Sequence, residues 1–390
     1  MKLVLYLALV ASIAAAQPHK VLVLSVDGLD NRYLTQAGEL GLRIPNIRKL
    51  VAGGQVSRGV IGVVPTVTWP SHTTMITGVD PAVHGIRGNR RPKSEGGEYY
   101  WDVSLLKVPT LLDAMRKAGR TTATITWPVT VSAPVTYNLP EYFTKRRGGD
   151  MDLRSIESKS APRDLVANIS RMFPAFPQQW MEDRTRAMAV RYLLKTHQPD
   201  LILAHFVDLD SESHDMGPFT REANATLEHI DELIGDILRD MPSGYVFVLT
   251  SDHGFEAVND EYHLNLKGVH GNGGFAIADT PEAADQMRKL NGPVGREIPR
   301  EEVLRFAPEL ANAAAVFEPA PNTMFAYGGD GNASARSKPA EAGNHGHWPM
   351  RYRSVYIAFG PGIKPERLPE FSQKEIARRL GALLGVDFRP

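Results

Sequence analysis

Short runs of β-branched residues alternate with amphipathic helical patterns along most of the chain, and this alternation limits the possible folds more than any other feature. The β-type runs lie at residues 19–28, 56–64, 120–127, 199–208, 243–254 and 353–360. Apolar residues at helical spacing occupy residues 108–120, 185–197 and 225–241 between them. Strands separated by helices favour a largely parallel sheet that is covered on both faces. We therefore expect an α/β protein whose central, mostly parallel sheet is sandwiched by helices.

The length of 390 residues allows a large buried core. Residues 138–175 and 255–340 interrupt the alternation, because they are rich in Pro, Gly, Asn and charged residues. We found no internal repeat. The sequence therefore predicts one domain over residues 17–390, in which these two segments are inserted as lids.

Composition excludes several functional classes. Lys plus Arg and Asp plus Glu number 44 each, so no overall charge attracts the chain to a nucleic-acid duplex or an anionic membrane. Cysteine is absent, which excludes disulfides, a thiolate nucleophile and thiolate metal ligands. Any metal would have to be bound through oxygen and nitrogen.

The N-terminal residues 1–16 have the layout of a secretory signal peptide. One Lys precedes an apolar run from Leu3 to about Ile13, and small residues follow at 14–16. The apolar run is shorter than the about 20 residues that span a bilayer. We expect an exported protein, periplasmic or extracellular, without a stable membrane anchor.

Asp and His residues recur where the predicted strands end. They are Asp27, Asp210, His214, Asp252, His253 and, in a Gly-rich turn, His345. The carboxyl ends of parallel strands meet at one edge of a sheet. Mixed Asp and His ligands suit Zn²⁺ or a related divalent ion, and paired ions serve phosphoryl transfer. The sequence therefore predicts a site for two divalent metal ions.

The spacing within two of these motifs sets a geometric condition. Asp210 and His214 are four residues apart and can share one helical face. Asp252 and His253 are adjacent and would point to opposite faces of a strand. Both can therefore bind one site only if the strand ends before them, which Gly254 permits.

Residues 65–78, PTVTWPSHTTMITG, are rich in hydroxyl groups where a strand should hand over to a helix. One interpretation makes Thr68 the helix N-cap and Pro70 the first helical residue. Each strand-end Asp likewise has an ordinary interpretation as a turn or cap residue. Caps alone do not explain why residues of one metal-binding type recur at five separate elements.

The order of these motifs resembles the nucleotide pyrophosphatase/phosphodiesterase family of the alkaline phosphatase superfamily. The resemblance covers most of the chain, through VLVLSVDGLDNRYL, PTVTWPSHTTMITGVDPAVHGIRGN, DLDSESHDMGP, LTSDHGF and GNHGHWPMRYRSVYIAFGPGIK. It implies an alkaline-phosphatase-like fold and a hydrolase that cleaves phosphodiester or phosphoanhydride bonds with two ions, expected to be Zn²⁺.

The resemblance also implies roles for single residues. Thr68, in the motif Thr-aromatic-Pro-x-His, would be the nucleophile and form a phospho-threonine. Asn89 would donate to a phosphoryl oxygen. One zinc would be bound by Asp27, Asp252, His253 and the Thr68 oxygen, and the other by Asp210, His214 and His345. His270 is the rival candidate for the place of His345, whereas His72 and His84 are expected to be structural.

Substrate choice stays open at this stage. Trp69 either stacks on a nucleobase or packs as a core aromatic. His205 and His347 stand where nucleotide-cleaving relatives often have Tyr, and His205 is a candidate substrate contact. The basic residues Arg87, Arg90 and Arg91, together with residues 145–147, keep phosphomonoester hydrolysis as an alternative, beside a phosphonate substrate. A non-catalytic secreted binding protein on the same fold is the alternative of another class.

Overall fold

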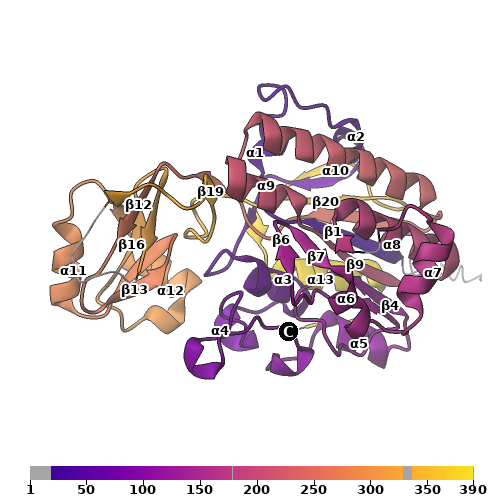
Figure 1. Cartoon of the computed structure of the whole chain (residues 1–390), viewed down its shortest axis with the longest axis horizontal. Helices are drawn as coiled ribbons and strands as arrows, with labels where there is room; N and C mark the ends of the chain where they lie inside the picture. The colour runs from indigo at the N-terminus through magenta and orange to yellow at the C-terminus, as the bar shows by residue number, and fades with distance from the viewer. Residues whose placement is uncertain (1–18, 178, 328–335, 390) are drawn as a thin grey trace, which may run out of the picture.

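The computed structural model describes residues 19–177, 179–327 and 336–389. Its described residues form a large α/β body and a smaller lobe, which extends to the left in Figure 1. The predicted signal peptide, residues 1–16, lies outside the described residues. Among the residues that are described, no helix is both long enough and apolar enough to cross a bilayer.

An eight-stranded sheet forms the centre of the body. From edge to edge its strands are β21 (Glu366–Leu368), β2 (Gln55–Ser57), β20 (Tyr356–Phe359), β10 (Tyr245–Thr250), β1 (Lys20–Val26), β9 (Leu201–Phe206), β4 (Thr122–Ile125) and β5 (Tyr137–Leu139). Only β20 runs antiparallel to its two neighbours, and the other adjacent pairs are parallel. The prediction of a mostly parallel sheet is confirmed.

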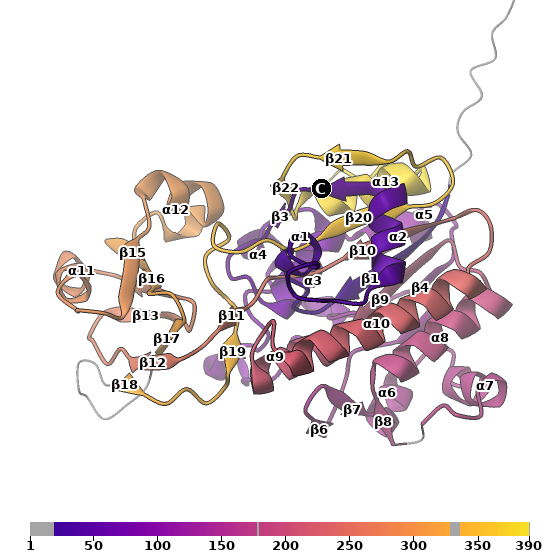
Figure 2. The same ribbon diagram turned by 90° about the horizontal axis from the view of Figure 1, so that it is seen from above.

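Helices cover both faces of this sheet (Figure 2). Along β1, Leu22 and Leu24 join one apolar cluster and Val21 and Val23 the other, because successive side chains of a strand point to opposite faces. The first cluster packs against helices α2 (Pro45–Gly53), α8 (Asp183–Thr196) and α10 (Arg221–Asp240). The second packs against α3 (Thr68–Thr77), α5 (Leu111–Lys117) and α13 (Glu375–Leu384). The three predicted helical segments overlap α5, α8 and α10, although α8 and α10 each begin a few residues earlier than predicted.

The lobe is formed by the segment that the sequence suggested was a lid over residues 255–340. It contains a four-stranded sheet in the order β13 (Val269–Asn272), β14 (Phe275–Ala278), β16 (Ala315–Pro319) and β15 (Val294–Glu297), with helices α11 (Pro281–Arg288) and α12 (Arg300–Phe306). A second small sheet joins β17 (Thr323–Ala326), β12 (Asp260–His263) and β18 (Arg336–Ser337). The lobe therefore has an apolar core of its own, which includes Met287 and Phe317.

Two short strands connect the lobe to the body. On the outgoing chain β11 (Glu256–Ala257) pairs antiparallel with β19 (Gly343–Asn344) on the returning chain. The other predicted insertion, residues 138–175, begins within β5. It then forms the hairpin β6 (Arg146–Arg147) and β7 (Asp150–Asp152), which pairs with β8 (Trp180–Met181), and the helices α6 (Leu153–Lys159) and α7 (Leu165–Met172).

Candidate active site

Three adjacent strands bring most of the predicted metal ligands to one edge of the sheet. Asp27 follows β1 directly, and Asp252 and His253 follow the end of β10. Asp210 and His214 lie on helix α9 (Asp208–Met216), which starts just after β9. Because β10, β1 and β9 are parallel neighbours, their carboxyl ends adjoin. The last predicted ligand, His345, follows β19 on the chain that returns from the lobe.

The side chains of these residues converge. His253 Nε2 lies 3.2 Å from Asp27 Oδ1 and 3.1 Å from Asp252 Oδ2, so β10 has ended early enough for both neighbours to face one site. The Nε2 atoms of His214 and His345 lie 3.5 and 3.6 Å from Asp210 Oδ1. Two sets of side chains have ligand atoms close enough to hold an ion, one of Asp210, His214 and His345 and the other of Asp27, Asp210 and His253.

Four atoms at this convergence are buried without a hydrogen-bond partner: Asp27 Oδ1, Asp210 Oδ1, Asp252 Oδ2 and His253 Nε2. Buried polar atoms are normally paired, and unpaired ones cost about 1–3 kcal/mol each. Asp252 Oδ1, in contrast, accepts hydrogen bonds from the backbone N–H groups of Gly28 and His253, at 3.1 and 3.0 Å. Oxygen and nitrogen atoms left free at one point fit a divalent cation.

The site also carries an excess of negative charge, which likewise favours a bound cation. Burial, together with the charge of Asp27, holds the pKa of the Asp252 carboxyl well above its usual range. Burial disfavours protonation of His214, but the charges of Asp210 and Glu341 outweigh burial and raise the pKa of His214 to about 11. Both shifts arise from an excess of negative charge in a buried place. Bound cations would compensate it, so the donor set fits two divalent ions.

Thr68 opens helix α3 beside this cluster. The preceding strand, β3 (Val60–Ile61), ends well before it, and Val67 is the N-cap, without a side-chain cap hydrogen bond. The interpretation of Thr68 as the cap is therefore wrong, because Thr68 is already helical and its hydroxyl does not cap the helix. The hydroxyl instead stands in the first turn, where free N–H groups and the helix dipole favour negative charge.

A cavity of about 270 Å³ opens over these groups. Its lining includes the predicted residues Asp27, Thr68, Trp69, Asn89, Asp210, His214 and His345. Asp252 and His253 do not line it, but His253 Nε2 lies 3.2 Å from Oδ1 of the cavity-lining Asp27. Asn89 Oδ1 accepts a hydrogen bond from the Trp69 backbone N–H at 3.0 Å, which leaves the Asn89 amide nitrogen as a donor.

An aromatic wall borders the cavity. Trp69 is only 3% exposed and packs against Tyr99 and Trp101, with ring centroids 4.8 and 5.9 Å apart. Its packing thus favours the core interpretation, whereas the half-buried Tyr99, which sequence reasoning missed, also lines the cavity. The Arg90 guanidinium lies 4.0 Å from the Tyr99 ring centroid. No motif pointed to Tyr99, since it lies in an irregular loop.

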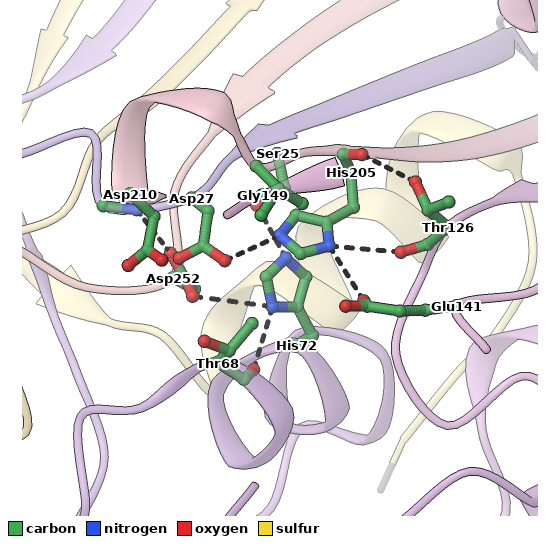
Figure 3. Close-up of polar contacts among 12 residues, drawn as sticks. Ser25, Asp27, Thr68, His72, Thr126, Glu141, Gly149, His205, Asp210 and Asp252 are labelled. Carbon is green, nitrogen blue, oxygen red and sulfur yellow. Dashed lines mark hydrogen bonds and ion pairs between the residues drawn. The ribbon is translucent and has the colours of Figure 1, made fainter. Parts of the chain in front are cut away.

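His205 does not reach the cavity. Its ring is fully buried behind Asp27, with Nε2 3.0 Å from Asp27 Oδ2 and Nδ1 3.2 Å from Glu141 Oε2 (Figure 3). The prediction that His205 contacts the substrate is therefore wrong, because its side chain extends from β9 into the protein rather than toward solvent. Burial disfavours protonation of His205, but these two carboxylates more than offset it and raise its pKa well above the usual range.

The other histidines named in the sequence analysis belong to neither ligand group, although His72 Nδ1 lies 3.7 Å from Asp252 Oδ2. His72 bonds Thr68 O and Ser25 Oγ, both at 2.9 Å, and His84 bonds Thr74 Oγ1 at 3.1 Å. His347 lies 2.9 Å from Glu256 at the base of the lobe. His270 is 59% exposed and pairs with Asp279 in the lobe, so it belongs to neither ligand group.

The predicted basic cluster contributes one side chain to the cavity. Arg146 lines it, whereas Arg87, Arg90, Arg91, Lys145 and Arg147 do not. Three carboxylates besides the candidate ligands line the same cavity, those of Glu141, Asp215 and Glu341. The wall around the candidate metal centre therefore carries more negative than positive charge.

These features define an α/β protein with a hydroxyl group beside a candidate two-metal centre at the carboxyl edge of its sheet. Residues 21–334 match the family described as Type I phosphodiesterase / nucleotide pyrophosphatase. The chain belongs to this family.

Curated relatives are distant and longer. The chain is 25% identical over 250 residues to a venom phosphodiesterase of Macrovipera lebetinus, an alignment that covers 61% of this chain and 26% of the relative. It is 21% identical over 294 residues to the bis(5'-adenosyl)-triphosphatase ENPP4 of Bos taurus, covering 71% and 56%. The chain thus spans between a quarter and about half of the length of these relatives.

Solved structures share the fold. Human ectonucleotide pyrophosphatase / phosphodiesterase 5 superposes with a TM-score of 0.67 at 17% identity, covering 95% of this chain and 96% of that one. An inactive threonine-to-alanine variant of the murine protein, in complex with AMP, gives 0.65 at 16% identity with the same coverage. The alkaline-phosphatase-like fold that the sequence predicted is confirmed.

Proposed function

We propose that this chain is a metal-dependent hydrolase that cleaves phosphodiester or phosphoanhydride bonds with Thr68 as its nucleophile. One observation carries the proposal. Unpaired buried atoms of Asp27, Asp210, Asp252 and His253 converge beside the hydroxyl-bearing first turn of α3. Family membership supports the same chemistry, and the relatives are named for cleavage of phosphodiester or phosphoanhydride bonds.

Two ions, expected to be Zn²⁺, would share the site. Asp27, Asp252, His253 and the Thr68 oxygen would hold one, and Asp210, His214 and His345 the other. When bound, divalent cations favour the deprotonated form of a hydroxyl and neutralise charge on phosphoryl oxygens.

The chain's own residues would perform two displacements. In the first, Thr68 Oγ1 releases its proton to solvent and attacks phosphorus, forming a P–O bond; the bond to the leaving oxygen breaks, and this oxygen departs as an anion that takes up a proton from solvent. In the second, water attacks the phospho-threonine, the P–Oγ1 bond breaks, and Thr68 regains a proton. Asn89 donates its amide N–H to a non-bridging oxygen, because its Oδ1 is already engaged by the Trp69 N–H.

The charge of the cavity wall favours diesters over monoesters. A phosphomonoester carries a second negative charge, and the cavity is lined by the carboxylates of Glu141, Asp215 and Glu341 besides the candidate ligands, with Arg146 as its one basic side chain apart from histidine among the described residues. A diester presents less charge to these carboxylates. Tyr99 also lines the cavity, but its ring is stacked on Trp101 and covered by the Arg90 guanidinium, so it offers the substrate an edge rather than a free face.

We also propose that the protein is exported. The layout of residues 1–16 supports this, and venom enzymes among the relatives are consistent with it.

The test compares bis(p-nitrophenyl) phosphate with p-nitrophenyl phosphate, with and without chelator. We expect faster hydrolysis of the diester, its loss on chelation and its return with Zn²⁺. A clear preference for the monoester would overturn the diesterase assignment in favour of a phosphomonoesterase. If zinc-loaded protein hydrolysed neither substrate, the non-catalytic binding role would replace the proposal.

A further inference from the structure

The two oxygens of Asp27 have different surroundings. Oδ2 is 3.0 Å from His205 Nε2, whereas Oδ1 has no hydrogen-bond partner and faces His253 Nε2 at 3.2 Å. The Asp27 carboxylate is thus held by His205 through Oδ2 (Figure 3), while its Oδ1 is left for an ion. A change in the His205 contact would allow the carboxylate to rotate.

His205 is itself held in place by contacts on the side of its ring away from Asp27. Its Nδ1 lies 3.2 Å from Glu141 Oε2 and 3.1 Å from the Thr126 backbone carbonyl, and its ring centroid lies 4.2 Å from that of His72. Thr126 follows β4 and Glu141 follows β5. Contacts therefore extend from Glu141 through His205 to Asp27, across the strands β5, β4, β9 and β1.

Two simpler roles for His205 do not explain these contacts. Direct substrate binding is ruled out, because the ring is fully buried and does not line the cavity. Simple packing would not require both ring nitrogens to face acceptor oxygens. Asp252 provides a useful contrast, since two backbone N–H groups orient its carboxylate.

We infer that His205, held in place by Glu141, is a positioning residue that orients Asp27 and thereby sets the affinity of the cation bound by Asp27, Asp252 and His253. This inference rests on the two-ion site of the proposed function. Groups that orient metal ligands from behind typically change metal affinity by about 10–100-fold when removed.

A matched pair of substitutions tests the inference. The amide nitrogen of His205→Gln can take the place of imidazole Nε2 and donate to Asp27, whereas that of His205→Asn reaches only the place of Nδ1. Both replacements are neutral and polar. We expect His205→Asn to weaken one of the two zinc affinities by about 10–100-fold and His205→Gln to retain most of it.

The affinities are measured by titrating metal-free protein with zinc against a chromophoric chelator, with ion stoichiometry from elemental analysis. His84→Asn is the control, because His84 is equally buried but bonds Thr74 and Ile86 rather than a candidate ligand. We expect it to bind both ions as the wild type does. Glu141→Gln gives a second test should the His205 variants fail to fold, and should weaken the same ion by a smaller factor.

Equal affinities for the Asn, Gln and wild-type proteins would overturn the inference. So would an equal loss in both His205 variants and in His84→Asn, which would indicate general loosening of the core. A wild-type chain that binds no zinc would instead overturn the two-ion site itself, so the two failures are distinguishable.

Discussion

The two candidate ligand groups are built in different ways. Asp27, Asp252 and His253 are almost completely buried and follow β1 and β10, which pair in parallel over six positions. In the other group the side chain of His214 is 20% exposed, and it stands on the nine-residue helix α9. His345 follows β19, a strand of two residues. The first group is therefore part of the sheet core. The geometry of the second group depends on contacts that its residues make outside the sheet.

Those connections come from the lobe and its returning chain. His214 Nδ1 lies 2.9 Å from Glu341 Oε2 and 3.0 Å from Gly343 O, and Asn272 of the lobe donates to Gly346 O at 3.0 Å. The lobe thus supports one ligand group from outside the sheet. We therefore expect the body alone to hold the ion of Asp27, Asp252 and His253, whereas the affinity for the second ion should depend on the position of the lobe.

Removal of the Thr68 hydroxyl should have the largest effect on activity. Both ligand groups should still bind their zinc ions. We expect Thr68→Ala to lower turnover by about 10³-fold or more while fold and bound zinc are retained, because the nucleophile is lost but most ligands remain. Steady-state rates with the diester substrate and zinc content measure the two effects. Normal activity in this variant would place the nucleophile elsewhere.

Loss of a ligand from the second group should remove one zinc ion and leave the ion of the first group bound. His345→Ala removes one ligand of the more exposed group, so we expect the loss of one bound ion and a fall in turnover of about 10²–10³-fold. Elemental analysis after gel filtration gives the ion count. His270→Ala is the control, because His270 pairs with Asp279 in the lobe. If His345→Ala kept its zinc count and His270→Ala lost an ion, His270 rather than His345 would be the ligand.

Most of the body and the candidate ligands could be predicted, because the relevant rules are local. Long buried β-branched runs indicate parallel strands, and Asp27, Asp252 and His253 follow directly where such runs end. The sequence set the end of the strand before Asp252 as a condition for Asp252 and His253 to face one site, and β10 meets it by ending at Thr250.

The remaining features depend on contacts between distant segments. The lobe strands have two to five residues and lie among Gly and Pro, so their pairing left no periodic pattern in the sequence. Glu141 and His205 are 64 residues apart and meet only because β9, β4 and β5 are neighbours. His205 was expected at the substrate because nucleotide-cleaving relatives often have Tyr at this place. Its actual orientation depends on the face of β9 that it occupies, which the resemblance does not give.

A methyl group added at Gly274 should show whether the lobe controls the zinc affinity of the second ligand group. A Cβ at Gly274 would lie 2.3 Å from the backbone of Gly346, next to His345. We expect Gly274→Ala to lower the free energy of unfolding by about 2–3 kcal/mol and to weaken one zinc affinity, since backbone must move. Urea unfolding and zinc titration measure these changes.

Gly38→Ala is the matched control, because its Cβ would meet nothing within 4 Å. It should leave both the free energy of unfolding and the zinc affinities near their wild-type values. Weaker binding of both ions in Gly274→Ala would show that the body group also depends on the lobe.

The smallest effect should come from the exposed wall beside the second group. Arg146 and Glu341 both line the cavity, whereas the neighbouring Arg147 pairs with Asp150 at 2.7 Å and does not line it. We expect Arg146→Gln to raise KM for an anionic diester about 3–10-fold without changing kcat or zinc content, because an exposed charge contributes on the order of 1 kcal/mol. Arg147→Gln should leave KM unchanged. A fall in kcat alone in Arg146→Gln would mean that this guanidinium acts on the transition state, and the exposed wall would then take part in the chemistry.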